Sequence, residues 1–168
     1  MNPISEGSLK FTFPADWKAE KYEGWIFYRN QFQSVCGGAK AVDILAMDTN
    51  QCLWLIEIKD YRQHSRTKVI KLADEVAMKV RDTLAGLAAA QCNANDENEK
   101  TFARCALGVH RLKVVLHIEQ PAKHSKLFPR VFDPADITQK MKQLIKAISP
   151  HPLVTEKGKM RNVAWTVQ

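Results

Sequence analysis

Residues 41–62 constrain the fold of this chain more than any other part of the sequence. They contain two short apolar runs that alternate as β-strands do, joined by a polar turn at residues 48–51. This pattern is typical of a hairpin. Asp43 and Glu57 lie equally far on either side of Asn50, so a hairpin folded about Asn50 places them opposite each other, with Cβ atoms about 5 Å apart.

Lys59 joins the two carboxylates on the same side of the hairpin. Alternate residues of a strand share a face, so Glu57 and Lys59 project with Leu53 and Leu55. Two carboxylates this close are costly unless a cation joins them. They could form a metal site, or a solvent-facing ion pair with Lys59 worth under about 1 kcal/mol. The shared leucines predict that the charges lie at the rim of a partly buried face, which favours the metal site.

Length and composition indicate one soluble domain. A chain of 168 residues is long enough to bury a core. It has no apolar run near the roughly 18 residues of a membrane span, and its N-terminus lacks a signal-peptide apolar region. We therefore expect a cytoplasmic protein with no membrane partner. The cysteines lack a CxxC pair and the histidines lack HxxxH spacing, so we expect reduced structural thiols and no zinc site.

The net charge of +7 lies in the last third of the chain. Residues 1–109 hold 14 Lys/Arg and 14 Asp/Glu, whereas residues 110–168 hold 11 Lys/Arg and 4 Asp/Glu. One-sided positive charge suits a polyanion such as nucleic acid. A solvated helix face with a basic tail is the alternative, and the sequence leaves both open.

Periodicity and turn residues predict the remaining elements. We expect strands at 9–14, 17–22, 111–119 and 163–167, helices at 69–92 and 136–148, and a polar connector at 93–100. Residues 23–35 fit an amphipathic helix, which we favour, although their aromatic content also suits a strand. Asp133 is the expected cap of the last helix, with Pro134 at its first position.

The order of these elements predicts the topology. A long helix between the hairpin and strand 111–119 favours parallel pairing of that strand with the second hairpin strand. We therefore expect a single α/β domain over residues 1–168, with a mixed central β-sheet flanked by helices on both faces. Its core would span about residues 20–120, followed by a basic C-terminal helix and strand at about 121–168.

A strand bearing Asp43, a tight hairpin, the run Glu57-Ile58-Lys59, and then a long helix and a strand resemble the PD-(D/E)XK nuclease superfamily, which has the restriction-endonuclease-like fold. The resemblance covers roughly residues 20–120 and rests on three polar residues plus topology. Val42 stands where the family pattern has a proline. The resemblance implies a divalent-metal-dependent phosphodiester hydrolase, a nuclease that acts on DNA.

The expected chemistry uses Mg²⁺ or Mn²⁺. Mg²⁺ prefers oxygen ligands and keeps several waters, so one or two carboxylates and a substrate phosphate suffice. Asp43 and Glu57 would bind the metal, with the backbone carbonyl of Ile58 as a further ligand by resemblance. Many family members carry another acidic residue before the hairpin, for which Glu23 or Glu20 is the candidate. Lys59 would orient the attacking water or hold the scissile phosphate, which makes Asp43, Glu57 and Lys59 the expected catalytic residues.

Further polar residues are candidates for contacts with nucleic acid. Gln63, His64 and Arg66 follow the motif closely and could contact phosphate, although a plain polar loop is the alternative. Basic residues after position 110, among them Lys123, Lys126 and Arg130, would hold the nucleic-acid backbone.

The long helix also carries charges. Glu75, Lys79 and Asp82 share one stripe of it, for which an ordinary i,i+4 pair of Glu75 with Lys79 is the favoured interpretation and a cleft border the alternative.

Two other functions stay open. The chain could be a catalytically inactive nuclease-like domain that binds nucleic acid or a protein partner. It could also be a structural subunit whose aromatic residues Trp17, Trp25, Phe27 and Tyr28 face a partner. Because 168 residues leave little room for a separate recognition domain, a protein partner or a homodimer could supply specificity.

Overall fold

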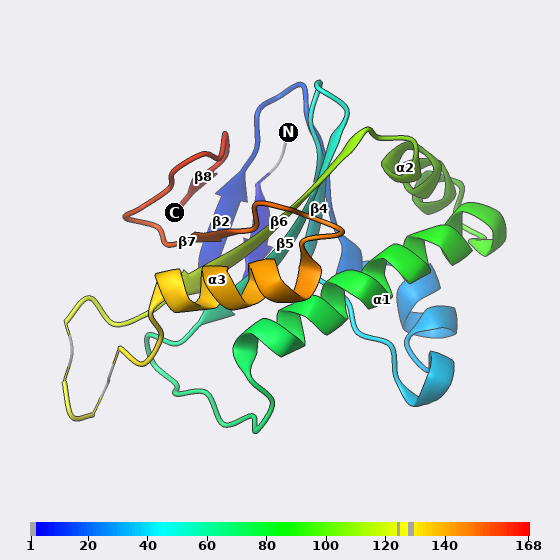
Figure 1. The fold of residues 1–168 in the computed structure, drawn as a ribbon. Helices are drawn as coiled ribbons and strands as arrows, with labels where there is room; N and C mark the ends of the chain where they lie inside the picture. The colour runs from blue at the N-terminus through cyan, green and yellow to red at the C-terminus, as the bar shows by residue number, and fades with distance from the viewer. Residues whose placement is uncertain (1–2, 124, 128–129) are drawn as a thin grey trace.

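A five-stranded mixed sheet lies at the centre of the molecule, with strand order β3-β4-β5-β6-β7 (Figure 1). The structure is a computed structural model that describes residues 3–123, 125–127 and 130–168. Strands β3 (Lys18–Lys21), β4 (Ile44–Met47) and β5 (Cys52–Asp60) are antiparallel neighbours. Strands β6 (Arg111–Glu119) and β7 (Leu153–Thr155) continue the sheet in parallel with β5. The prediction of an α/β domain with a mixed sheet is confirmed.

The hairpin register is the one that the sequence predicts. Ile44 pairs with Ile56, and Met47 pairs with Leu53. The predicted parallel pairing of β5 with β6 is also present, from Cys52 beside Arg111 to Asp60 beside Glu119.

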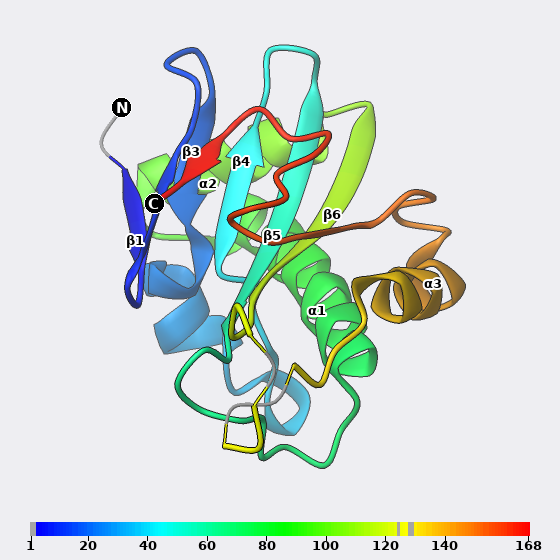
Figure 2. The ribbon, with the colours of Figure 1, turned by 90° about the vertical axis from the view of Figure 1, so that its left-hand side faces the viewer.

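A second, three-stranded sheet covers the face of the central sheet that lies away from the helices. It consists of β1 (Ile4–Glu6), β2 (Leu9–Thr12) and β8 (Thr166–Val167). The apolar side chains between the two sheets include Trp54 and Trp165, whose rings meet edge to face at 5.2 Å. Our prediction of helices on both faces was therefore wrong, because short strands bury the Trp54 side of the hairpin instead (Figure 2).

The helices α1 (Leu72–Asn93), α2 (Glu97–Leu107) and α3 (Pro134–Ile145) lie on the other face of the central sheet (Figure 1). Helix α1 buries Val76, Val80 and Leu87 against it. Helix α3 begins as predicted, since the Asp133 carboxylate accepts a hydrogen bond from the Ala135 N–H at 2.8 Å. Among the described residues, no helix is long and apolar enough to cross a membrane.

Helix α2 corrects the prediction of a polar connector at 93–100. Asp96 caps this helix by accepting hydrogen bonds from the N–H groups of Asn98 and Glu99. Glu99 then accepts hydrogen bonds from the N–H groups of Ile26 and Phe27 at 2.6 and 3.0 Å. The polar residues of this segment thus cap the helix and bind the distant backbone of residues 26–27.

Residues 23–35 do not form the predicted single helix. They contain a 3₁₀ turn at Tyr22–Gly24, a π-helical turn at Tyr28–Phe32, and the start of another 3₁₀ turn at Val35–Gly37, because the extended backbone of Trp25 interrupts the run.

The interpretation that aromatic residues face a partner was also wrong. Trp17, Trp25, Phe27 and Tyr28 are all buried, with at most 8% of each residue exposed.

Candidate functional site

The hairpin brings Asp43 and Glu57 together at one end of β4. Asp43 comes just before this strand, where its N–H donates to the Ile56 carbonyl at 3.1 Å. Its carboxylate Oδ2 accepts a hydrogen bond from the Ile58 N–H at 2.6 Å. The exposed fractions of Asp43 and Glu57 are 5% and 0%, so the carboxylates lie inside the protein and not at the rim of a partly buried face.

Two lysines neutralise these carboxylates. Lys59 Nζ, from the same strand as Glu57, lies 2.6 Å from Glu57 Oε1. Lys79 Nζ, from α1, lies 2.6 Å from the same oxygen and 3.7 Å from Asp43 Oδ1. Neither Glu57 oxygen has a partner in hydrogen-bond geometry among the described residues. The two ammonium groups therefore neutralise Glu57 as close ion pairs.

This environment perturbs the protonation of the cluster. Burial, followed by repulsion from Glu57, raises the pKa of Asp43 from 3.8 to about 7, although Lys79 and the Ile58 N–H oppose the rise. Burial lowers the pKa of Lys59, but Glu57 and Glu75 raise it more, so the net pKa is above its usual value. Near neutral pH the cluster can thus exchange a proton at Asp43 while Lys59 stays charged.

Glu75 connects this cluster to the loop that follows β5. Its carboxylate, 1% exposed, lies 3.4 Å from Lys59 Nζ and 2.6 Å from the Arg66 guanidinium, and it also pairs with Lys68. Burial raises the pKa of Glu75, but its bonds to Lys68 and Arg66 lower it to about 2 overall. The favoured prediction of a Glu75–Lys79 pair was wrong, because Glu75 contacts the loop and Lys79 contacts the hairpin.

The donor chemistry of the cluster is compatible with a divalent cation. Glu57 Oε2 has no hydrogen-bond partner among the described residues, and Asp43 Oδ1 has only the distant Lys79. Unengaged carboxylate oxygens are the ligands that Mg²⁺ prefers. Within the described residues, however, no three His, Cys, Asp or Glu side chains surround a common metal position. Magnesium held by Asp43, Glu57 and the Ile58 carbonyl therefore stays a prediction.

The two acidic residues expected near the metal have other partners. Glu20 accepts a hydrogen bond from Trp25 Nε1 at 2.8 Å. Glu23 pairs with Lys21 at 3.2 Å. The contacts found for these residues thus connect them to neighbouring segments and not to Asp43.

Two loops meet at the carboxyl ends of the parallel strands β5 and β6 (Figure 2). We call residues 61–71 and 120–133 the basic loops. The Tyr61 N–H donates to the Glu119 carbonyl at 2.8 Å, and the Tyr61 and Phe132 rings lie 5.2 Å apart. Ligands of open α/β sheets bind at this end of parallel strands. The basic loops contain seven Lys/Arg and one Asp. Four of the cations pair with acidic residues outside these loops, namely Arg62, Arg66, Lys68 and Arg130.

The predicted nucleic-acid contacts all lie in the basic loops, but they differ in availability. Gln63, His64, Lys123 and Lys126 are exposed, and no ion pair within the described residues involves either of these lysines. Arg66 and Arg130 are engaged within the protein. Arg66 pairs with Glu75, and Arg130 pairs with Glu156 and donates to the Pro121 carbonyl.

Lys79 is the site residue that sequence reasoning misplaced. It lies three residues after Val76 and seven after Leu72, both buried, and this helical spacing was the signal that it faces the sheet. The four cysteines are free thiols, with Cys52 buried and Cys36, Cys92 and Cys105 exposed.

The chain is similar to a known protein along almost its whole length. The chain is 34% identical to the cysteine--tRNA ligase of Neisseria meningitidis serogroup A / serotype 4A (strain DSM 15465 / Z2491), over an alignment of 209 residues. The alignment covers 99% of this chain but 30% of the ligase, so the chain spans under a third of the length of that relative. No protein-family model matches the chain. No solved structure matches it either.

These findings overturn the nuclease interpretation. The relative is a tRNA ligase, so both the PD-(D/E)XK family assignment and the predicted metal-dependent nuclease activity were wrong, and the inactive nuclease-like alternative gains no support. The physical reason is that a strand ending in Glu-x-Lys specifies a buried ion cluster as readily as a hydrolytic centre. In this chain, Lys59 and Lys79 both contact the glutamate of the motif.

Proposed function

We propose that this chain is an RNA-binding module that contacts the phosphate backbone of tRNA through its basic loops. The relative with which it aligns almost from end to end is named as a ligase of tRNA. The proposal concerns binding of tRNA and not the ligation reaction, because the alignment covers 30% of the ligase.

The concentration of positive charge at one end of the sheet is the observation that carries the proposal. Seven Lys/Arg and one Asp lie in the basic loops, where Tyr61 and Phe132 join the two segments. Lys71, Lys123 and Lys126 are exposed and make no ion pair within the described part of the chain. Such lysines bind phosphate groups and release the counterions of a nucleic acid.

Salt dependence of tRNA binding tests the proposal. With Lys71, Lys123, Lys126 and Lys140 each contacting one phosphate, the slope of log K against log salt concentration should be about −3 to −4. We expect fluorescence anisotropy with labelled tRNA to give this slope, and Lys123→Ala/Lys126→Ala to make it less steep by about 1.5.

A matched double variant controls for the loss of charge alone. Lys18 pairs with Met47 beside the hairpin turn, and Arg104 lies on α2, so both are remote from the basic loops (Figure 1). Lys18→Ala/Arg104→Ala removes the same charge and should leave the slope unchanged. Equal effects of the two double variants, or no binding of tRNA at low salt, would refute the proposal.

Magnesium or manganese at Asp43 and Glu57 is a separate proposal. A carboxylate pair with an unengaged Glu57 oxygen supports it. Titration calorimetry of the protein with MgCl₂ or MnCl₂ should show binding that Asp43→Asn weakens at least about tenfold, because the variant removes one of two charged ligands. Identical heats for wild type and variant would exclude this site.

A further inference from the structure

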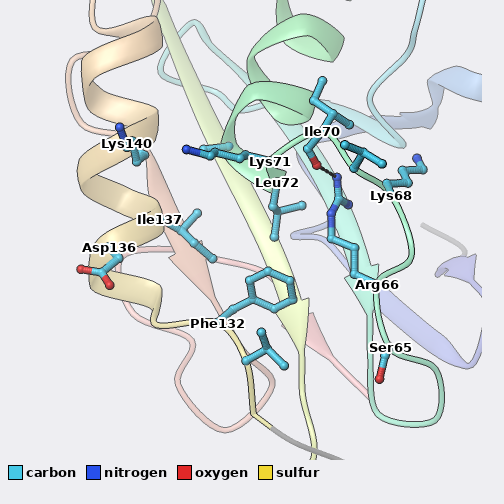
Figure 3. A pocket seen from close by; sticks show the side chains of 13 residues that line it. Ser65, Arg66, Lys68, Ile70, Lys71, Leu72, Phe132, Asp136, Ile137 and Lys140 are labelled. Atoms are coloured by element: carbon cyan, nitrogen blue, oxygen red, sulfur yellow. Dashed lines mark hydrogen bonds between the residues drawn. The ribbon is translucent and has the colours of Figure 1, made fainter.

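A groove of about 420 Å³ lies between the basic loops, beside the first residues of α1 and α3 (Figure 3). The loop after β5 forms one wall, and the segment from Val131 to Lys140 forms the other. This volume falls within the range of about 300–1,000 Å³ that is usual for small-molecule sites. The groove is distinct from the buried cluster around Glu57, because none of its lining residues belongs to the hairpin.

The floor of the groove is apolar and held in a fixed shape. Leu72, Phe132 and Ile137 point into it from α1, the second basic loop and α3 (Figure 3). The backbone of Phe132 is fixed on both sides by the Gln120 side chain, which accepts from its N–H and donates to its carbonyl, each at 3.0 Å. The Arg66 guanidinium fixes the other wall by donating to the Ile70 carbonyl at 2.7 Å.

The mouth of the groove exposes apolar surface that has no partner among the described residues. Val69 is fully exposed and Val131 is 65% exposed. A partly exposed aromatic ring next to such side chains is the kind of surface on which an unpaired base stacks.

The rim of the groove is cationic. Lys68, Lys71 and Lys140 line it, and Lys71 extends toward the helix that carries Lys140 (Figure 3). Within the described residues, neither Lys71 nor Lys140 has an ion-pair partner. Asp136, the carboxylate of the lining, can accept a hydrogen bond from the amino group of a base. A cationic rim around an apolar floor complements an anionic ligand with an aromatic body.

We propose that this groove binds one unpaired base of an RNA, stacked on Phe132, with the adjacent phosphates on Lys71 and Lys140. The inference rests on the RNA binding proposed above and adds what the RNA must offer, namely a base outside a duplex. Bases within a helix are covered by their neighbours, so they cannot enter a groove of this size. Single-stranded ends and loops present such bases without the cost of unstacking.

Two RNA hairpins test the groove. One carries a single unpaired 2-aminopurine at its 3′ end, and the other is a blunt hairpin with the same stem. We expect quenching of the 2-aminopurine fluorescence on binding, because the base stacks on an aromatic ring. Phe132→Leu keeps an apolar side chain without the ring and should weaken binding of the overhanging hairpin about 5- to 100-fold. Its affinity for the blunt hairpin should not change.

A second substitution avoids any effect on folding. Val69 is fully exposed, so Val69→Gln alters the mouth of the groove without changing the core. Val69→Gln should weaken binding of the overhanging hairpin about twofold to fivefold. Ile26→Gln is the matched control, because Ile26 is 56% exposed and belongs to a segment that contacts α2 through Glu99. This control should have no effect on either hairpin.

The outcomes separate the two proposals. Equal affinity for both hairpins, with no quenching and no effect of Phe132→Leu, would overturn the base groove while leaving phosphate binding by the basic loops intact. Failure of both hairpins and of tRNA to bind would overturn both proposals. Displacement of the overhanging hairpin by poly-glutamate, with the same loss in Phe132→Leu, would identify an acidic peptide as the ligand and overturn the assignment to RNA.

Discussion

Asp43→Asn isolates the electrostatic cost of the buried cluster. The asparagine has nearly the same shape, and its side-chain carbonyl can still accept the Ile58 N–H that the carboxylate accepts at 2.6 Å. The substitution removes the charge that burial and Glu57 disfavour. We therefore expect the variant to be more stable than the wild type above neutral pH.

The magnitude follows from the raised pKa. The pKa of Asp43 is about 7 in the folded protein against 3.8 as its usual value. Between these two values the folded state holds a proton that the unfolded chain has lost, so the stability of the wild type falls as pH rises from about 4 to 7. Each pKa unit corresponds to about 1.4 kcal/mol, which gives an upper limit of about 4 kcal/mol. The variant lacks this dependence.

Urea unfolding at a series of pH values between 4 and 9, in the presence of EDTA, measures the difference. We expect Asp43→Asn to exceed the wild type by about 1–4 kcal/mol at pH 8, and the difference to shrink steadily as pH falls to 4. Asp16→Asn serves as the control, because Asp16 is exposed and the substitution removes one carboxylate outside the buried cluster. A variant less stable than the wild type at pH 8, or a difference independent of pH, would refute the reasoning.

Three further predictions concern buried contacts of α1 and α2. Glu75→Gln should destabilise the protein by about 1–3 kcal/mol at pH 7 and speed hydrogen exchange in residues 61–71. Because the pKa of Glu75 is lowered to about 2 in the folded protein, the stability difference between wild type and variant should fade as pH drops from 4.5 toward 2. Glu99→Ala should cost about 2–4 kcal/mol in urea unfolding, because the Ile26 and Phe27 N–H groups lose their acceptor; a smaller loss would mean that water replaces it. Gly86→Ala should lower the melting temperature, because a Cβ at this position would meet the Tyr22 hydroxyl. Adding Tyr22→Phe should restore much of the lost stability. An equal loss from Gly86→Ala in the wild type and in the Tyr22→Phe variant would disprove the clash.

The sequence determined the hairpin and its register. The turn at residues 48–51 and the alternation of apolar residues fix which residues oppose each other, so Asp43 and Glu57 meet as predicted. The parallel pairing of β5 and β6 was also predictable, because a long helix between two strands favours it. In each case the interactions are local or depend on chain connectivity.

The helix α2 and the second sheet were beyond sequence reasoning. Glu99 is charged within a polar run, and its anchoring role exists only because Ile26 and Phe27 arrive from a distant part of the chain. The strands predicted at 9–14 and 163–167 are present as β2 and β8. Their pairing with β1 into a separate sheet that covers Trp54 was not predicted, because it depends on contacts between the two ends of the chain.

Tertiary contacts determined the chemical character of the site. The residues Asp43, Glu57 and Lys59 were found from the sequence, but the motif by itself led to the wrong family and activity. The packing of α1 on the sheet places Lys79 against Glu57. Contacts between the two basic loops form the groove beside Phe132. Local sequence thus set the strands and their register. Which charges neutralise one another depends on contacts between distant segments, and only the folded chain specifies those.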